Sequence, residues 1–331
     1  MCLYPKVIKN PKYKANKKNG GNIPPVSDER VIYVPIGCNN CIECRKQKAR
    51  AWQVRLLEDL KEHKNGKFIT LTFSNESIQH LANETYCKDL EGYELDNAIA
   101  TLGVRRFLER WRKEYRRSLR HWLVTELGHN GTENIHIHGI VWTDEPMNKV
   151  EHHWKYGFIW KGKMVNGKII NYVNEATVNY ITKYVTKIDL INQSYKPIIL
   201  TSPGIGKNYT EGQGDWTKNK YKAGETIETY RNRQGYKMNL PIYWRNKIYS
   251  EYEREKLWIE KLDKAERWVC GERVSVAGGD EDEYNRLVEW HRKRTKKLGY
   301  GSGEISWERQ VYERERRIII IKERMKKKTA Q

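Results

Sequence analysis

Apolar side chains recur along the middle of the chain with the two spacings that distinguish strands from helices. Short apolar or alternating runs predict strands over residues 67–73, 122–127 and 135–142. The last two strands are separated by a segment rich in turn-forming residues, so we expect them to form a hairpin. Apolar residues at helical spacing predict helices over residues 45–63, 102–119 and 174–187.

Other segments carry loop signals or shorter patterns. Prolines and a Gly-Gly pair predict a loop over residues 1–44. A shorter pair of strands is predicted around residues 157–160 and 168–172. The sequence Ser-Pro-Gly-Ile-Gly at residues 202–206 predicts a turn, and residues 208–235 are loop-like.

These changes in pattern divide the chain into three segments. Helices dominate from residue 241 onward, and residues 314–328 are predicted to form a charged helix or a frayed tail. The predicted segments are a cysteine-containing N-terminal segment with a basic helix (1–66), a central domain (67–250) and a basic helical extension (251–331).

No apolar run approaches the roughly 20 residues that span a bilayer, so no membrane partner is expected. Lysines interrupt the N-terminal region, which lacks the apolar stretch of a signal peptide. We therefore expect the protein to stay in a reducing cytoplasm. In that compartment its six cysteines are thiols or metal ligands rather than disulfides.

The composition points to a polyanionic partner. The 331 residues carry a formal net charge of +20, which favours a salt-sensitive association with nucleic acid, although a solvated basic surface is the plainer interpretation. The chain has 21 Tyr and 12 Trp but only 4 Phe. Such aromatic side chains can stack on unpaired bases while their polar edges stay hydrated.

Two histidines on a predicted strand are candidate metal ligands. Residues two apart on a strand point to the same face, so His136 and His138 project together. Glu126 on the preceding strand is the candidate third ligand, and Asp144 and Glu133 are less well placed. Three protein ligands with open positions describe a catalytic site rather than a closed structural one. The alternative is a pair of surface or hydrogen-bonded histidines.

The predicted helix after Asn174 carries two tyrosines and two lysines. Tyr180 and Tyr184 are four residues apart and share a face, and so do Lys183 and Lys187. A phenol has a pKa near ~10 and is rarely ionised at neutral pH without help. Nearby ammonium groups favour the phenolate and bind phosphate, so this helix is a candidate source of nucleophiles. The alternative is an amphipathic helix that packs two tyrosines on a sheet.

Three cysteines stand at Cys-x-x-Cys spacing directly before the first predicted helix, at positions 38, 41 and 44. A closed zinc site needs a fourth ligand. The candidates are Cys2, which the flexible intervening segment favours, and Cys87 and Cys270. A structural Zn²⁺ site formed by Cys2, Cys38, Cys41 and Cys44 is one interpretation, and reduced, partly buried cysteines are the other.

Two of these motifs resemble those of a known enzyme superfamily. His136-Ile-His138 resembles the HUH motif of rolling-circle replication initiators, in which U is a bulky apolar residue. The helix resembles the two-tyrosine motif of initiators from microviruses, which are small single-stranded DNA phages. Its matching residues are Tyr180, Lys183, Tyr184 and Lys187.

Further segments extend the resemblance over about residues 30–250. Residues 68–73 are similar to the first motif of these initiators, and Glu126 matches their acidic third ligand. The cysteine segment over residues 34–45 and the turn at residues 202–206 resemble gokushovirus-type initiators. The resemblance implies an α+β fold, in which a central antiparallel sheet carries helices on one side. It also implies Mg²⁺ or Mn²⁺ as the ion, although His and carboxylate ligands alone do not exclude zinc.

The resemblance implies a specific reaction at the replication origin of a single-stranded DNA phage. One tyrosine, either Tyr180 or Tyr184, attacks a phosphate of the origin and becomes linked to the 5′ end. The free 3′ hydroxyl primes a host polymerase in the bacterial cytoplasm, and a host helicase is a further expected partner. The second tyrosine cuts the regenerated origin, and joining then releases a circle.

Two other functions stay open from the sequence. A plasmid or transposon initiator of the same superfamily uses the same chemistry, although the cysteine segment favours the phage. A non-enzymatic, zinc-containing nucleic-acid-binding protein belongs to a different class. Formation of a covalent protein–DNA adduct separates the enzymes from the binding protein.

Overall fold

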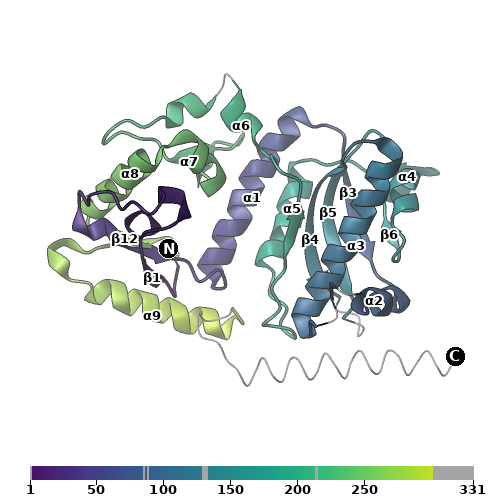
Figure 1. Cartoon of the computed structure of the whole chain (residues 1–331), viewed down its shortest axis with the longest axis horizontal. Coiled ribbons are helices and arrows are strands. Elements are labelled where there is room, and N and C mark those ends of the chain that lie inside the picture. Colours follow the sequence, from purple (N-terminus) through teal and green to yellow (C-terminus); the bar gives the residue numbers. More distant parts are fainter. Residues whose placement is uncertain (1, 85, 88, 129–132, 213–214, 301–331) are drawn as a thin grey trace. The chain divides into compact units, whose positions relative to one another are not determined.

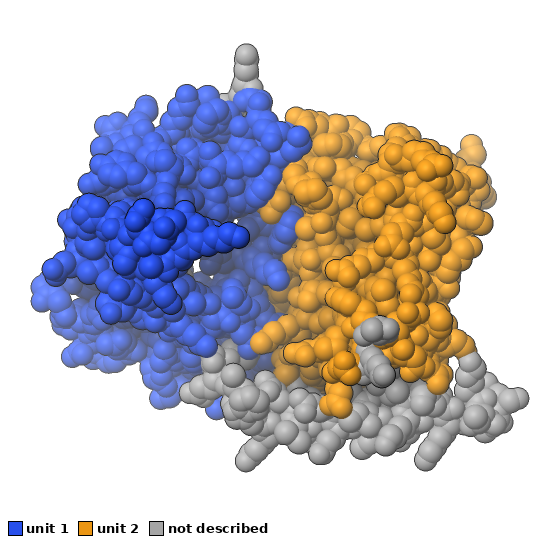
Figure 2. All heavy atoms as spheres, viewed as in Figure 1, with its two compact units in different colours: residues 1–54, 207–305 blue, residues 55–206, 306–331 orange. Residues whose placement is uncertain are grey.

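We describe the protein from a computed structural model, over residues 2–84, 86–87, 89–128, 133–212 and 215–300. The chain forms two compact units, coloured separately in Figure 2. Among the described residues, unit 1 contains residues 2–54 and 207–300, and unit 2 contains residues 55–206. The charged tail expected at residues 314–328 lies outside the described residues. The three-segment division stays a prediction.

Unit 2 is built on a five-stranded antiparallel sheet with the strand order β6-β3-β5-β4-β9 (Figure 1). Its strands are β3 (Gly66–Thr72), β4 (Arg120–Leu127), β5 (Ile135–Trp142), β6 (Ile159–Trp160) and β9 (Ile199–Thr201). Its helices are α2 (Asn75–Ala82), α3 (Gly92–Tyr115), α4 (Met147–His153), α5 (Glu175–Thr186) and the C-terminal turns of α1 (Ile42–Glu62). The three long strands and the three helices predicted from apolar spacing are confirmed. The short strand β9 was not predicted.

The two faces of this sheet differ in chemistry. Ile135 and Ile137 point to one face, where they are fully buried in a core that includes Phe107 and Trp111 of α3. His136 and His138 alternate with them and point to the opposite face. Helix α5 packs on that second face. The expectation of helices on one side is therefore wrong, because α5 buries its own apolar side chains there.

Helix α5 begins where its sequence predicts. The side chain of Asn174 caps the helix, because its Oδ1 accepts a hydrogen bond from the backbone N–H of Thr177 at 2.9 Å. Its apolar stripe is buried and consists of Val178, Ile181 and Val185. These contacts fix the rotation of the helix and so decide which way its tyrosines point.

The edge strand β6 leads into a small hairpin of β7 (Lys163–Val165) and β8 (Lys168–Ile170). We predicted that segments near β6 and β8 pair with each other. This pairing is wrong, since β6 pairs with β3, and Asn166-Gly167, both with positive φ, closes the separate hairpin. The hairpin returns at Asn171, whose side chain accepts from the backbone N–H of Phe68 at 2.8 Å and donates to its carbonyl at 2.7 Å.

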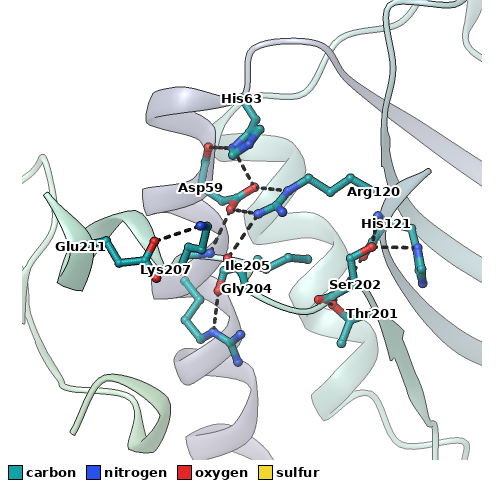
Figure 3. Close-up of polar contacts among 12 residues, drawn as sticks. Asp59, His63, Arg120, His121, Thr201, Ser202, Gly204, Ile205, Lys207 and Glu211 are labelled. Atoms are coloured by element: carbon teal, nitrogen blue, oxygen red, sulfur yellow. Dashed lines mark hydrogen bonds and ion pairs between the residues drawn. The ribbon is translucent and has the colours of Figure 1, made fainter. Parts of the chain in front are cut away.

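The Ser-Pro-Gly-Ile-Gly turn is confirmed and joins β9 to the C-terminal turns of α1 (Figure 3). Asp59 of α1 is 1% exposed in its side chain, and it accepts hydrogen bonds from the Arg120 guanidinium and, at 2.9 Å, from the backbone N–H of Gly206. Gly206 has φ +71°, and a Cβ there would lie 2.7 Å from the Arg55 carbonyl oxygen. The turn therefore needs glycine at this position.

Unit 1 combines short strands and helices. Its strands are β1 (Lys6–Lys9), β2 (Tyr33–Ile36), β10 (Thr229–Arg231), β11 (Lys237–Asn239), β12 (Glu266–Val269) and β13 (Glu272–Ser275). Its helices are the N-terminal turns of α1, α6 (Asn208–Glu211), α7 (Ile242–Ile248), α8 (Glu251–Asp263) and α9 (Asp282–Lys297). Short 3-10 helices occupy Pro11–Tyr13, Lys17–Asn19, Glu29–Val31, Asp215–Asn219 and Ala277–Gly279.

Two loop predictions in unit 1 are partly wrong. The first segment contains the hairpin of β1 and β2, whose residues are mostly exposed and give no alternating signal. Residues 208–235 contain α6 and β10, which pack into a core where Tyr209 stacks on Trp244 with ring centroids 4.1 Å apart. Helices dominate the region after residue 241, as predicted.

The α+β fold class is confirmed, with its central antiparallel sheet, a cysteine cluster near the N-terminus and a helical C-terminal region. Among the described helices, none has the length and apolar character needed to cross a lipid bilayer.

Candidate functional site

Sheet register brings a histidine and a carboxylate together on the face covered by α5. On β5, His138 lies opposite Val124 of β4, and Glu126 lies two residues further along β4. His138 Nε2 is 2.9 Å from Glu126 Oε2. On the other side, His138 Nδ1 is 3.0 Å from Thr70 Oγ1 of β3. The hydroxyl therefore orients the ring so that Nε2 faces the carboxylate.

Lys187, which follows α5, contacts the second oxygen of the same carboxylate. Its Nζ forms an ion pair with Glu126 Oε1 and lies 5.7 Å from the centroid of the Tyr184 ring. Burial acts to raise the pKa of Glu126, but the hydrogen bonds from His138 and Lys187 outweigh it and leave that pKa below its ordinary value. The carboxylate is therefore ionised and holds positively charged or hydrogen-bonding groups on both oxygens.

The two tyrosines of α5 meet at their hydroxyl groups. Tyr180 Oη and Tyr184 Oη are 2.6 Å apart, and their rings are nearly perpendicular, at 89°. Tyr184 lies flat against His138, with ring centroids 4.3 Å apart and an interplanar angle of 4°. Tyr180 is 50% exposed and meets Phe68 of β3 edge-on at 6.0 Å. Both phenols therefore lie beside the His138–Glu126 pair, and one of them faces solvent.

Electrostatics around Tyr184 oppose its ionisation in this arrangement. Burial raises its pKa well above its ordinary value, and the hydrogen bond with Tyr180 and the charge of Glu126 raise it further. Activation of this phenol therefore needs additional positive charge nearby. Lys183 is exposed on the same helix, one turn from Lys187.

His136 occupies a looser place in this arrangement. It lies opposite Glu126 on β4 and opposite Thr72 on β3. Its ring packs over Gly128, where a Cβ would lie 2.6 Å from His136 Cε1. Among the described residues, the ligand atoms of His136, His138 and Glu126 do not all lie within 4.8 Å of one another. The structure thus brings His138 and Glu126 together more closely than it brings His136 to either.

The two acidic residues considered less well placed lie away from the histidines. Asp144 follows the far end of β5, where it accepts a hydrogen bond from Asn65 at 3.0 Å. Glu133 precedes β5 with a positive φ and is buried. Sequence reasoning missed Thr70 and Phe68, which contact His138 and Tyr180. A signal was present, since both alternate with buried residues on the strand that pairs with β5.

A small pocket opens beside Tyr184 and Lys187. The rest of its lining is Thr125, Glu126, Leu127, Asp189, Tyr195 and Pro197. The segment after α5 is held in place because Tyr195 donates a hydrogen bond to Thr125 at 2.7 Å and Ile198 N–H donates to the same hydroxyl at 3.0 Å. The wall of the pocket opposite α5 is therefore tied to β4.

A second cluster lies in unit 1 and consists of thiols. The sulfur atoms of Cys2, Cys38, Cys41 and Cys44 all lie within 4.8 Å of one another, and those of Cys2 and Cys41 are 3.8 Å apart. Sulfur ligands about 2.3 Å from a tetrahedral zinc lie about 3.8 Å from one another. The donor set and spacing therefore fit a closed zinc site.

Backbone N–H groups also point at these sulfurs. Cys2 Sγ accepts from the N–H of Tyr4 at 3.3 Å and of Cys38 at 3.2 Å, and Cys38 Sγ accepts from the N–H of Cys41 at 3.3 Å. Hydrogen bonds from the Cys44 side chain lower the pKa of Cys41 to about 4, against the opposing effect of burial. Thiolates, the form that binds metal, are thus favoured in part of the cluster.

The fourth member of the cluster is Cys2 rather than either alternative. Cys87 is buried in the core of unit 2, beside α2 and α3. Cys270 packs against the cluster as part of an apolar core with Leu3 and Val288, but it does not join the group of close sulfurs. The chain from Cys2 to Cys38 returns to the start of α1 through the β1–β2 hairpin.

The part of the chain that carries the His138–Glu126 pair is similar to a known protein family. Residues 66–189 match the family model of the replication-associated protein ORF2. The matched segment begins with β3 and ends after α5, so it includes both tyrosines and excludes the cysteine cluster. No curated protein and no solved structure matches the chain.

Proposed function

We propose that this protein is a replication initiator that nicks single-stranded DNA by tyrosine attack. The observation that carries the proposal is the meeting of Tyr180 and Tyr184 at 2.6 Å beside the His138–Glu126 pair. The similarity of residues 66–189 to replication-associated proteins supports it. The net charge of +20 suits a DNA substrate.

A divalent ion fits the donor groups of this face. His138 and Glu126 would hold it, with His136 as the third ligand, and a set of two imidazoles and one carboxylate suits Mn²⁺ and accommodates Mg²⁺. Such an ion supplies Lewis-acid polarisation of the scissile phosphate. Lys187 holds a place on the same carboxylate and has to give up this ion pair when Glu126 turns to a metal.

The tyrosine performs the covalent step. A phenolic oxygen of α5 attacks the phosphorus, an O–P bond to the tyrosine forms, and the bond from phosphorus to the 3′ oxygen breaks. The phenolic proton ends on the leaving 3′ oxygen, so the products are a 5′-phosphotyrosine and a free 3′ hydroxyl. Lys183 and Lys187 stabilise the charge on the phosphate and the phenolate.

Two phenols at one site support a cycle of cutting and joining. After the first tyrosine is linked to DNA, the second can cut the regenerated origin, and the new 3′ hydroxyl attacks the stored phosphotyrosine to release a circle. With its gokushovirus-like cysteine segment, the chain fits an initiator of a single-stranded DNA phage. Its partners are then the phage origin and the polymerase and helicase of a bacterial host.

Adduct formation tests this proposal. Overlapping single-stranded oligonucleotides that tile the genome encoding the protein are incubated with it and Mn²⁺, and a covalent adduct is sought on a denaturing gel. The wild-type protein should form an adduct with one oligonucleotide. Replacing both Tyr180 and Tyr184 with Phe should abolish the adduct, while each single variant keeps part of it.

The matched control is Tyr172→Phe, because Tyr172 is exposed but lies before α5. This variant should form the adduct at the wild-type rate. If the double variant still forms an adduct, the nucleophiles are assigned wrongly. If no oligonucleotide gives an adduct with any divalent ion while binding persists, the protein is the non-enzymatic binder, and adducts with a plasmid or transposon origin alone would change the replicon assigned.

We also propose that the four clustered thiols hold a structural zinc ion. The tetrahedral spacing of the sulfurs and their N–H contacts support it. The purified protein should contain about one zinc per chain by mass spectrometry of metals. Cys41→Ser should lose the metal, whereas the controls Cys87→Ser and Cys270→Ser should keep it. Iron, or no metal in the wild type, would contradict the assignment.

A further inference from the structure

We propose that the edge strand β6 forms a base-stacking surface on which Phe158 and Trp160 hold the unpaired DNA strand that leads to the tyrosines. The inference rests on the proposed function, since it names the part of the protein that positions the substrate. It assigns a role to two aromatic residues that lie outside the His138–Glu126 pair and outside α5.

Register places both aromatic residues in the rows that contain the histidines. Trp160 pairs with Thr70, which pairs in turn with His138. Phe158 lies one step further along the edge, where its backbone N–H donates to Thr72 Oγ1 at 2.9 Å and its carbonyl accepts from Thr72 N–H at 2.9 Å. Thr72 pairs with His136.

The alternation of side chains confirms the face. Ile159, between the two aromatic residues, is buried in the core on the α3 side of the sheet. Phe158 and Trp160 therefore point to the other side, the face that carries His136 and His138. A strand of DNA crossing this face from the β6 edge meets the aromatic residues first and the histidines next.

Ring contacts link the edge to the proposed nucleophiles. Trp160 meets Phe68 edge-on with centroids 5.3 Å apart, and Phe68 meets Tyr180 at 6.0 Å. The series continues through Tyr184 to His138. Phe158 extends it outward and is 65% exposed, although it is among the four phenylalanines of the chain. Exposed rings in such a row form a stacking platform that accepts any base.

Charge next to these rings matches a phosphate backbone. The hairpin of β7 and β8 follows β6 directly, and Lys163 and Lys168 are exposed on it. Asn171 fixes the base of the hairpin by donating to the carbonyls of Phe68 and Lys161 at 2.7 and 2.8 Å. The lysines are thus anchored beside the rings. Rings for bases and ammonium groups for phosphates together favour unpaired DNA over duplex, whose bases are already stacked.

Equilibrium binding tests the surface without any cleavage. Fluorescence anisotropy of a labelled oligodeoxythymidylate is measured with the full-length protein in EDTA. Phe158→Ala and Trp160→Ala should each weaken binding about tenfold, the size typical of losing one stacked base. Phe158→Tyr and Trp160→Phe retain a ring and should bind within about twofold of wild type. An Ala variant that binds as tightly as wild type overturns the proposal.

Two controls separate stacking from loss of structure. Tyr86→Ala removes a half-exposed ring of unit 2 that packs against Arg105 and lies outside the β6 edge, so it should leave binding unchanged. A labelled duplex should lose little affinity in Phe158→Ala. Equal weakening for duplex and single strand would show that the residue supports the fold or general charge binding, and would overturn the stacking role.

The hairpin lysines are tested by salt dependence. The variant with both Lys163 and Lys168 replaced by Ala should show a shallower slope of log affinity against log salt, reduced by about one to two, because fewer counterions are released. An unchanged slope removes these lysines from the proposal. Photocrosslinking of an oligonucleotide that contains 5-iododeoxyuridine should label the peptide with residues 158–160, and crosslinks confined to unit 1 would contradict it.

This experiment and the adduct assay fail independently. If the adduct forms but Phe158→Ala binds like wild type, the stacking surface is wrong and the nicking proposal stands. If no adduct forms but the alanine variants lose affinity for single strands, the surface is real and the catalytic assignment is wrong.

Discussion

His138 and Tyr184 lie flat against each other across the gap between the sheet and α5. Parallel rings 4.3 Å apart leave little freedom for either side chain to rotate without moving the other. The orientation of the imidazole and that of the phenol are therefore coupled. The hydroxyl of Thr70 adds a third constraint on the same imidazole.

Single-residue prediction from the sequence succeeded where chemistry repeats at a fixed spacing. The pairs His136/His138 and Tyr180/Tyr184 are recognisable because strand and helix periodicity put each pair on one face. The stack of Tyr184 on His138 is not predictable, since it depends on how far α5 is rotated and shifted over the sheet. The same holds for Lys187, whose ion pair with Glu126 crosses from one element to another.

Burial of His121 makes stability depend on pH. Burial lowers its pKa below the ordinary value of 6.5, although a hydrogen bond to the Leu119 carbonyl acts in the opposite direction. As pH falls below 6.5, the unfolded chain takes up a proton that the folded protein refuses, so the free energy of unfolding decreases. Urea titrations at about pH 7.5 and about pH 5 should show this loss.

The variant His121→Asn should lose less stability over that pH interval than wild type, whatever its stability at neutral pH. His153 is buried as well and its pKa is lowered, so part of the wild-type loss should remain. Replacing the exposed His152 with Gln is the control and should keep the full wild-type loss. The same loss in His121→Asn as in wild type would remove His121 from this explanation.

A pair of glycines separates backbone strain from steric conflict. Gly206 and Gly167 have φ of +71° and +73°, but only Gly206 has backbone atoms of Arg55 within contact distance of an added Cβ. Gly167→Ala should cost about 1 kcal/mol from the left-handed conformation alone. Gly206→Ala should cost about 1–3 kcal/mol more, because the methyl group displaces α1. Urea denaturation measures both, and equal costs would contradict the contact.

At the level of elements, the contact of Asp59 with Arg120 fastens α1 to β4 within unit 2. Arg120→Met leaves the Asp59 carboxylate buried with only the Gly206 N–H and the His63 ring as neighbours. The expected loss in the free energy of unfolding is about 3–5 kcal/mol, the range for breaking a buried ion pair. Adding Asp59→Leu to this variant should recover part of that loss, since no buried charge remains.

Thermal and urea unfolding of the two variants and wild type check this prediction. A double variant less stable than Arg120→Met would show that the Asp59 side chain stabilises the turn at Gly206 on its own. The exposed pair Arg117–Glu145, 3.0 Å apart in the same unit, is the matched control, and Arg117→Met should change stability by less than about 1 kcal/mol.

Capping of α5 gives a prediction for the helix that carries the tyrosines. Asn174→Ala removes the acceptor of the Thr177 N–H and should destabilise the protein by about 1 kcal/mol. Asn174→Ser, which keeps an acceptor oxygen, should cost much less. Urea denaturation distinguishes the two, and equal losses would assign the effect to something other than the cap.

Long elements were predictable because each carries several turns or several alternations of apolar side chains. The helices α1, α3 and α5 and the strands β3, β4 and β5 all have this property. The missed strands are four residues or shorter, and the residues of β1 are all exposed. Their pairing comes from long-range backbone hydrogen bonds that leave no local pattern. Helices on both faces of the sheet were missed because no local pattern tells which face a helix covers.

For the whole molecule, net charge and aromatic composition indicated a nucleic-acid partner, but the assembly of unit 1 had no local signal. Unit 1 draws residues from both ends of the described chain, so Leu3 packs with Val269 and Val288. The thiol cluster borders this core, with Cys41 and Ile42 as shared residues. A zinc ion there would cross-link the N-terminal segment to α1.

Removal of that metal should affect one unit selectively. Treatment with a chelator and a mild thiol-reactive agent should increase hydrogen exchange in β12, β13 and α9, which pack around the cluster. Amides of β3, β4 and β5 should keep their protection, because the core of unit 2 contains none of the four thiols. Mass spectrometry of exchange reports both, and uniform loss of protection would contradict a local role for the metal.

The amide of Asn171 occupies both backbone groups of Phe68 at the place where β6 no longer covers β3. A bare strand edge is a template on which a second polypeptide can add, and many proteins block it with charge or proline. Here one side chain imitates a neighbouring strand. Its loss would turn that stretch of β3 into an adhesive border, so the tendency of this protein to self-associate in a crowded cell is limited there by a single carboxamide.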